Sequence, residues 1–304
     1  ILAVIEYVGM IMSGIMSISF TVSEIPRAKV NCMRISEVLT ADSVPETRAE
    51  GQPPLKGGIR LKGVSYRYPA GSDDALSGID MEILPGQKIA FIGGTGSGKS
   101  TVVRLLLGLA SPTGGELSFD GIPAETLGER RLRENISCVL QRDTIFSGTI
   151  RENVLAGREV EDTKVLRAVS DAQLIDFVEA QKEGLDYPTT QRGGNLSGGQ
   201  KQRLAIARAL LKPAAIYIFD DSFSALDFLT ESRLRACLAE RLKGKTQIIV
   251  TQRVTTAMNC DKIYVFDGGR IDACGTHEEL MRSCGIYREI YLSQTRRSAP
   301  ETGR

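Results

Sequence analysis

The chain has 304 residues, 42% of them apolar, and a formal net charge of +1 at pH 7. This length and composition allow one large or two ordinary domains, and the balanced charge, with no long basic run, argues against a nucleic-acid-binding protein. Six scattered cysteines without a C-x-x-C pair are typical of a reducing cytosol, and the single histidine, His277, leaves little from which to build a histidine metal site or a Ser-His pair.

An apolar stretch opens the sequence. Residues 7–22 carry no charge, and Glu6 is the only charge before them. A helix rising about 1.5 Å per residue over this stretch would roughly cross a bilayer core of about 30 Å. Arg27, Lys29 and Arg34 follow, as expected of a cytosolic flank. The alternative is a buried helix of a soluble protein, because Glu6 is unfavourable in lipid unless it faces a cavity.

Residues 23–39 continue the helical pattern, with Pro26 expected to kink or break the helix near the membrane surface. Since the apolar pattern is already under way at Ile1, we expect the back part of a longer polypeptide. Residues 40–56 are predicted to be a linker containing the first domain boundary, because they include Pro45, Gly51, Pro53 and Pro54.

Beyond the linker, strand and helix patterns alternate. A half-buried strand is expected from residue 59 to residue 68 and a second at 76–83, while 88–92 leads into a glycine-rich turn. Further strands are predicted at 136–140, 214–219, 247–251 and 262–266. This alternation predicts a mostly parallel sheet with helices on its faces.

Helical spacing dominates the region between these strands. Apolar residues such as Val165, Val169 and Val178 predict an inserted helical subdomain over about 142–211. A final helix is expected at 278–292, with His277 as a surface residue at its start, followed by a disordered polar tail over 293–304.

The glycine-rich turn matches G-x-x-x-x-G-K-[ST] at every fixed position and lies between a predicted strand and a predicted helix. Glycines let successive backbone N–H groups approach an anion closely, and the following helix directs its positive end at the same anion. Lys99 can then reach the β- and γ-phosphates of a nucleotide, while Ser100 is suited to hold Mg²⁺. The alternative is a flexible glycine loop that happens to precede Lys-Ser. The predicted nucleotide-binding loop comprises Gly93, Gly94, Thr95, Gly96, Ser97, Gly98, Lys99, Ser100 and Thr101.

Two carboxylates follow the apolar run 215–219. A strand ending beside the phosphate loop would bring Asp220 to the Mg²⁺ and leave Asp221 near the γ-phosphate, where a base would align the attacking water. Taken alone this signal is weak, because buried strands often end in acids.

The segment 195–203 reads Asn-Leu-Ser-Gly-Gly-Gln-Lys-Gln-Arg. Its Leu-Ser-Gly-Gly-Gln core, between a phosphate loop and an acidic strand end, resembles the signature of ATP-binding cassette (ABC) proteins. The resemblance implies that the signature residues bind the γ-phosphate of ATP held by an opposite domain, and small residues opening a helix do form an anion site. The signature residues with this implied role are Ser197, Gly198, Gly199 and Gln200.

Other positions match the ABC pattern in order. The resemblance implies that Tyr68 stacks on adenine, that Gln141 reaches Mg²⁺ and the attacking water, and that residues 224–227 (Ser-Ala-Leu-Asp) cross a dimer interface. Without the other motifs, Tyr68 would be an ordinary strand aromatic and Gln141 a surface amide.

The resemblance covers about residues 55–292 and implies the fold of a P-loop ATPase, with a mostly parallel sheet, an antiparallel β subdomain and an α-helical subdomain. Residues 1–39 resemble the last membrane helix and its cytosolic extension in exporters that fuse membrane and ATPase domains, so the ATPase domain at 57–292 is expected on the cytoplasmic side of the cell membrane. Importer ATPases and soluble ABC proteins usually lack such a segment. ATP and Mg²⁺ are the implied cofactors, membrane lipid contacts the helix, and a small drug-like, lipid or peptide substrate is expected.

Two positions depart from the family pattern. Asp221 stands where a glutamate is usual, and Gln252 stands where the switch histidine is usual. The Asp221 carboxylate is one methylene short, and a misplacement of about 1 Å can lower a rate roughly 10²-fold. An amide such as Gln252 can bond a phosphate oxygen but cannot pass a proton. This chain's own site is therefore expected to bind ATP well and hydrolyse it slowly.

These departures, together with an intact signature, resemble one half of a heterodimeric exporter with one degenerate and one competent site. The partner would carry the glutamate and the histidine, and the signature of this chain would complete the partner's site. Two alternatives remain: a regulatory subunit that holds ATP with little turnover, and a homodimeric exporter that tolerates both substitutions.

Overall fold

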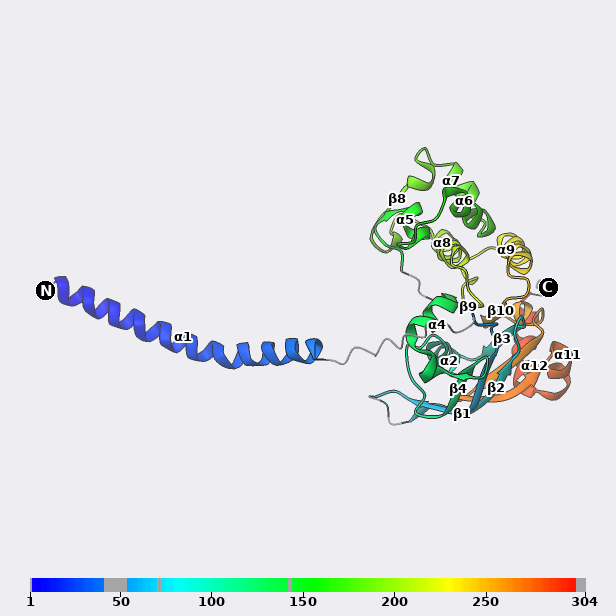
Figure 1. The fold of residues 1–304 in the computed structure, drawn as a ribbon, viewed down its shortest axis with the longest axis horizontal. Coiled ribbons are helices and arrows are strands. Elements are labelled where there is room, and N and C mark those ends of the chain that lie inside the picture. The colour runs from blue at the N-terminus through cyan, green and yellow to red at the C-terminus, as the bar shows by residue number, and fades with distance from the viewer. Residues whose placement is uncertain (1, 41–53, 70, 72, 142–143, 299–304) are drawn as a thin grey trace, which may run out of the picture. The chain divides into compact units, whose positions relative to one another are not determined.

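The computed structural model describes residues 2–40, 54–69, 71, 73–141 and 144–298. The chain divides into two compact units, Ile1–Glu46 and Thr47–Arg304. The first contains helix α1 (Leu2–Leu39), none of whose side chains is buried and which is long and apolar enough to cross a membrane. α1 bends partway along (Figure 1) but runs through Pro26 as one helix, so the expected break does not occur there. Most of the predicted linker lies outside the described residues.

A six-stranded sheet forms the centre of the second unit, and it confirms the predicted mostly parallel sheet. Its strands are β3 (Lys88–Gly93), β6 (Ile136–Val139), β9 (Ile216–Asp220), β10 (Thr246–Val250), β11 (Lys262–Asp267) and β12 (Arg270–Gly275). They lie in the order β12-β11-β3-β10-β9-β6, and β12 alone pairs antiparallel with its neighbour. β12 was not predicted, because its sequence, Arg-Ile-Asp-Ala-Cys-Gly, contains only one large apolar residue, Ile271.

A second sheet is entirely antiparallel and confirms the implied β subdomain. It consists of β1 (Ile59–Arg67), β2 (Asp74–Ile83), β4 (Gly114–Phe119) and β5 (Ile122–Pro123), in the order β2-β1-β4-β5. The predicted linker ends too late in the sequence, because Leu55 is already buried in the core beside β1.

The helical subdomain contains α5 (Ile150–Leu155), α6 (Asp162–Asp171), α7 (Ile175–Glu179) and α8 (Gly198–Leu211), with the short strands β7 (Gly148–Thr149) and β8 (Pro188–Thr189) and two 3-10 turns at Gly184–Asp186 and Gln191–Gly193. In Figure 1 these helices gather at one end of the unit. The other helices are α2 (Lys99–Leu106), α3 (Ala124–Leu127), α4 (Glu129–Asn135), α9 (Phe228–Arg241), α10 (Val254–Ala257), α11 (His277–Ser283) and α12 (Gly285–Ser298).

The predicted final helix is wrong in two respects. Cys284 has an extended backbone and separates α11 from α12, so there are two helices instead of one. The tail predicted to be disordered over 293–304 is helical as far as Ser298, and the side chain of Gln294 is hydrogen-bonded to Gln252 and Val254; residues 299–304 lie outside the described residues. His277 does begin α11, and its ring nitrogen Nδ1 lies 2.8 Å from the hydroxyl of the fully buried Tyr287.

Alternate residues of the central strands pack into two different hydrophobic cores. Ile89 and Phe91 of β3 face a core shared with α2 and the antiparallel sheet, whereas Ala90 and Ile92 face a core shared with α8 and the helical subdomain. This period of two is what a strand buried on both faces requires. The central sheet is thereby fixed from both sides, and so are the loops that leave its carboxyl edge.

Candidate functional site

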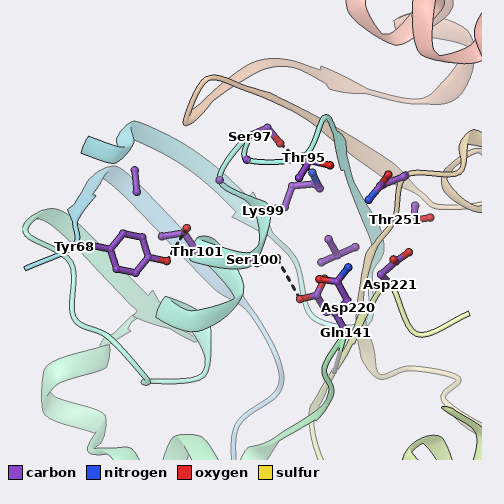
Figure 2. A pocket seen from close by; sticks show the side chains of 15 residues that line it. Tyr68, Thr95, Ser97, Lys99, Ser100, Thr101, Gln141, Asp220, Asp221 and Thr251 are labelled. Atoms are coloured by element: carbon purple, nitrogen blue, oxygen red, sulfur yellow. Dashed lines mark hydrogen bonds between the residues drawn. The ribbon is translucent and has the colours of Figure 1, made fainter. Parts of the chain in front are cut away.

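A cavity of about 350 Å³ lies at the carboxyl ends of three adjacent parallel strands, β3, β10 and β9. Val250 pairs with Phe91 on one side and with Asp220 on the other, so the segments that follow the three strands meet. Open α/β sheets commonly bind ligands at such an edge. The side chains drawn in Figure 2 line the cavity: Tyr68, Ala75, Thr95, Gly96, Ser97, Gly98, Lys99, Ser100, Thr101, Gln141, Asp220, Asp221, Val250, Thr251 and Gln252.

The structure therefore brings together most of the residues predicted for the nucleotide site. Gly93 and Gly94 belong to the same loop without lining the cavity, and the signature residues 197–200 lie elsewhere on the chain. Both acids at the end of β9 and both segments that carry Gln141 and Gln252 face the loop.

Steric constraints explain two of the loop glycines. Gly93 has φ +155°, and a Cβ there would collide with the carbonyl oxygen of Phe266 on β11. Gly98 has φ +100°, and its Cβ would lie 2.7 Å from Cδ2 of Leu76. Neither conformation nor space would accept an ordinary side chain, so the loop is held in a fixed shape before any anion binds.

Lys99, the first residue of α2, points its ammonium group back into the loop. Its Nζ donates to the carbonyl oxygens of Gly93 at 2.9 Å and Gly94 at 2.6 Å, and to the hydroxyl of Ser97 at 3.0 Å. The residue is only 8% exposed, and burial lowers its pKa, which the negative charges of Asp220 and Asp221 partly oppose. A phosphate entering the loop would give this cation an anionic partner in place of neutral carbonyls.

Ser100 and Asp220 form a pair of oxygen ligands. The Ser100 hydroxyl donates to Oδ2 of Asp220 at 3.4 Å, and Asp220 is 6% exposed. Burial raises the pKa of Asp220, because no solvent stabilises its charge. Mg²⁺ is usually held by one or two carboxylates, with phosphates and waters completing the octahedron. The donor set fits that pattern, and no self-sufficient cluster of three or more His, Cys, Asp or Glu side chains occurs among the described residues.

Asp221 has an unusual backbone. Its φ is +49°, in the left-handed region, and its N–H donates to the carbonyl of Val250 at 2.9 Å. Aspartate tolerates this conformation better than most residues, because its short side chain can bond locally. Burial raises the pKa of the Asp221 carboxyl, while the Arg253 charge and a hydrogen bond from Gln141 lower it. Asp221 thus follows Asp220 directly and is tied to the end of β10 by its backbone.

The two glutamines approach the cavity from different strands. Gln141 follows β6 and bonds Asp221 through its side chain. Gln252 follows β10 and is exposed on the cavity wall. Thr251, between β10 and Gln252, is fixed by an N–H bond of 3.0 Å to the carbonyl of Phe91. Both glutamines therefore line the same cavity as the glycine-rich loop.

Tyr68 stands at the open end of the cavity. Its hydroxyl lies 3.2 Å from the hydroxyl of Thr101, its ring packs edge-on against Tyr66 with centroids 5.0 Å apart, and the guanidinium of Arg104 lies 6.0 Å from the ring centroid. The side chain remains 38% exposed. Its ring is thus held in place with area left on which a flat base could stack.

The signature residues open α8. Ser197 is the N-cap: its hydroxyl accepts from the Gln200 N–H at 3.2 Å, and its own N–H donates to the Gln200 side chain at 2.8 Å. Ser197 and Gly198 are exposed, so this turn is accessible to another molecule. A Cβ on Gly199 would lie 3.1 Å from the carbonyl oxygen of Ala225, so the turn is also packed against residues 224–227.

Sequence reasoning missed several residues of the site. Ala75, Val250 and Thr251 line the cavity because they neighbour the loop in space, and no local motif indicates them. Arg253 was missed as well, although it follows Gln252 directly: its guanidinium bonds Glu231 Oε2 at 2.7 Å and the carbonyl oxygen of Ser224 at 3.2 Å.

Comparisons with known proteins agree with this geometry. Residues 76–224 match the family model described as ABC transporter. The chain is 39% identical over 261 residues to an ATP-dependent lipid A-core flippase of Bordetella pertussis, covering 84% of this chain and 42% of the flippase. It is 37% identical over 305 residues to an uncharacterized ABC transporter ATP-binding protein of Bacillus subtilis, covering 99% of this chain and 52% of the relative.

Among solved structures, a bacterial Atm1-family ABC exporter with ATP bound superimposes with a TM-score of 0.84 at 29% identity. The match covers 92% of this chain and 49% of the exporter chain. The chain thus spans about half the length of the curated relatives it matches.

Proposed function

This chain belongs to the ABC transporter family, and on that basis we propose that it is the ATP-binding part of an exporter in which two ATPase domains close around ATP. One observation carries the proposal. Residues 95–101 of the nucleotide-binding loop, the candidate magnesium ligand Asp220, and Asp221 all line one cavity, whereas the signature turn, whose Ser197 and Gly198 are exposed, does not line it. Each chain then supplies the nucleotide-binding loop of one site and the signature turn of the other. Closure of the two ATPase domains is coupled to the membrane helices.

The chain's own cavity binds MgATP through residues already in place. Lys99 binds the β- and γ-phosphates, Tyr68 stacks on the adenine, and Ser100, Asp220 and Gln141 would hold Mg²⁺. Such an ion would neutralise part of the phosphate charge. Asp221 and Gln252 face the γ-phosphate, with Asp221 aligning water.

ATP hydrolysis at the site built on this chain's own nucleotide-binding loop is slow. Asp221 holds its carboxylate one methylene nearer the backbone than a glutamate would, and Gln252 bonds a phosphate oxygen without transferring a proton. The pKa of Asp221 is raised by burial, which would suit a base, but the reach of the side chain sets the limit. ATP is therefore held longer here than at a competent site.

The signature turn of this chain serves the opposite site. Ser197, Gly198 and the first N–H groups of α8 would meet the γ-phosphate of ATP bound by the partner, because a helix N-terminus with small residues favours an anion. The preferred partner is a second exporter half that carries the catalytic glutamate and switch histidine, so hydrolysis at that site resets the pair.

Two alternatives differ in where ATP is hydrolysed. In the first, this chain is a regulatory subunit that holds ATP as a lasting clamp and biases the dimer toward closure. In the second, two copies of this chain form a homodimeric exporter that tolerates Asp221 and Gln252. Under either alternative we propose that the protein lies in the cell membrane, with lipid around α1, the ATPase domain in the cytoplasm, and a small drug-like, lipid or peptide substrate; the membrane-exporter relatives and the length and apolarity of α1 support this.

Lys99→Ala tests the nucleotide site. Removing the ammonium group should lower the ATP affinity of the purified full chain by about tenfold or more, as measured by titration calorimetry, because a charge-assisted contact to phosphate is lost. Unchanged affinity would refute the assignment of the loop.

Ser197→Asp tests the composite site. Aspartate preserves the helix cap, so α8 should remain folded, but its charge repels a phosphate. ATP binding to this chain alone should be unchanged, while hydrolysis by the two-chain assembly falls about tenfold or more. Thr276→Asp is the matched control, since Thr276 caps α11 with the same box geometry. Equal losses in both variants, or loss of ATP binding in Ser197→Asp, would contradict the arrangement.

A further inference from the structure

The segment that carries Gln252 is bonded to the C-terminal helix by one side chain. Nε2 of Gln294, on α12, donates to the carbonyl oxygen of Gln252 at 2.6 Å, and Oε1 of the same amide accepts from the N–H of Val254 at 2.9 Å. A single side chain thus spans Gln252–Val254, a segment about forty residues earlier in the sequence.

Both backbone groups need such a partner. Val254 is the first residue of α10, where backbone N–H groups have no partner within the helix, and the N-cap Arg253 offers no side-chain hydrogen bond. Gln252 lies beyond the end of β10, so its carbonyl oxygen has left the sheet ladder. A primary amide can donate to one and accept from the other at once, which neither a carboxylate nor an ammonium group can do.

Packing fixes only one end of this segment, because Val254 is 1% exposed and belongs to the hydrophobic core, whereas Gln252 is exposed. A second cavity of about 690 Å³ also borders the segment, and Asp221 and Gln252 line both cavities. The second cavity is also lined by Met258, Tyr291 and Thr295. Gln252 therefore lacks the close contacts that fix a core residue, so the position of its backbone depends more on hydrogen bonds than that of Val254 does.

Helix α12 is itself firmly anchored. Tyr287 is fully buried, with its hydroxyl 2.8 Å from Nδ1 of His277, and Ile290, one turn before Gln294, packs against the core. The amide of Gln294 is therefore presented from a fixed element. On the opposite side the Arg253 side chain bonds Glu231 and the carbonyl of Ser224, so the segment is tied at both sides.

We propose that Gln294 is a positioning residue that holds the backbone of residues 252–254 so that the Gln252 side chain meets the γ-phosphate. This inference rests on the proposed ATP site. Its consequence is that α12 adjusts the preference of the site for ATP over ADP, because only ATP carries the phosphate that Gln252 contacts.

Gln294→Leu in the purified full chain removes both hydrogen bonds and keeps the size of the side chain. Amide hydrogen exchange at Val254 should accelerate about fivefold or more in the nucleotide-free protein, as expected for one lost hydrogen bond. ATP affinity should fall about threefold to tenfold, and ADP affinity by less than about twofold.

Gln294→Glu separates the two bonds. The carboxylate can still accept from Val254, so exchange there should stay slow, but it cannot donate to Gln252, so ATP affinity should fall as in Gln294→Leu. Ser293→Ala is the control, because it removes an exposed hydroxyl bonded to Ile290 on the same helix and should change neither measurement.

Three outcomes overturn the proposal: unchanged exchange at Val254 in Gln294→Leu, faster exchange with unchanged ATP affinity, and equal losses for ATP and ADP. Failure of the wild-type chain to bind either nucleotide would instead refute the proposed function, and the role of Gln294 with it.

Discussion

Restoring the family's two usual residues should convert the slow site into a faster one. Asp221→Glu lengthens the carboxylate by one methylene, and Gln252→His supplies a ring that can carry and pass a proton. Both positions line the same cavity as Lys99, so their effects should be strongly coupled.

General effects of positioning and of proton transfer give a magnitude for each step. Recovering about 1 Å of reach is worth up to roughly 10² in rate, and a positioned proton-transfer group about 10² to 10⁴. Glutamate alone should raise turnover at most about tenfold, because Gln252 still cannot transfer a proton. The double variant should gain about 10²-fold or more, equivalent to about 3 kcal/mol of transition-state stabilisation.

A stability penalty should accompany the gain. Position 221 has φ +49°, and glutamate accepts this conformation less readily than aspartate, by about 1 kcal/mol. For a domain of this size the melting temperature should fall by about 2–4 °C. Gln252→His alone has an ordinary backbone and should leave the melting temperature unchanged.

Single-turnover hydrolysis of labelled ATP is the appropriate assay, in a two-chain assembly whose other site is disabled at its phosphate-loop lysine. If Asp221→Glu alone gave as much activity as the double variant, the short side chain of Asp221 would account for the entire loss of rate. That result would refute the role given to Gln252. A wild-type site that already turns over several ATP per second, as an ordinary enzyme does, would refute the slow-site proposal altogether.

Three further predictions follow from single contacts. Tyr68→Ala should lower the affinity for ATP about tenfold and leave the affinity for inorganic tripolyphosphate unchanged, whereas Tyr68→Phe should resemble the wild type. Equal losses of affinity for both ligands would exclude stacking of the base on Tyr68. Burial raises the pKa of Asp220, so the folded state holds its proton more tightly than the unfolded chain, and the ionised carboxylate destabilises the fold above that raised pKa. Asp220→Asn should therefore raise the melting temperature of the nucleotide-free protein near pH 7, and this gain should shrink as the pH falls below the raised pKa and vanish below the ordinary carboxyl pKa of 3.8. A gain that grows toward acid would contradict this sign. The Asp120 carboxylate accepts hydrogen bonds from the backbone N–H groups of Lys56, Gly57 and Gly58. Asp120→Ala should therefore lower the free energy of unfolding, measured in urea, by about 2–4 kcal/mol. A loss below about 0.5 kcal/mol would show that water replaces the carboxylate.

The parts of the site that could be predicted are those whose chemistry is local. The phosphate loop and its glycines form one contiguous motif, and the strand before Asp220 is continuous and apolar. The positions of Tyr68 and Gln141 were predictable only through the resemblance, since each is an ordinary residue type for its local sequence.

What could not be predicted depends on contacts distant in sequence. α12 extends to Ser298 although its last residues are polar, because Gln294 is tied to Gln252 and Val254 on another element. The left-handed backbone of Asp221 depends on its bond to Val250 of the neighbouring strand. No window of the sequence contains both members of these pairs.

A continuous set of hydrogen bonds joins the chain's own acid to the helix that we propose serves the partner. Gln202, on the signature helix α8, accepts from the Ala225 N–H at 3.0 Å and donates to the Ser224 hydroxyl at 3.1 Å. That hydroxyl in turn donates to the carbonyl oxygen of Asp221 at 2.9 Å, and Arg253 bonds the Ser224 carbonyl oxygen. Any shift of α8 must therefore strain or move the backbone of Asp221. If the chain's own site hydrolyses ATP slowly, as proposed, these hydrogen bonds would connect the bound nucleotide to the helix that serves the partner's site.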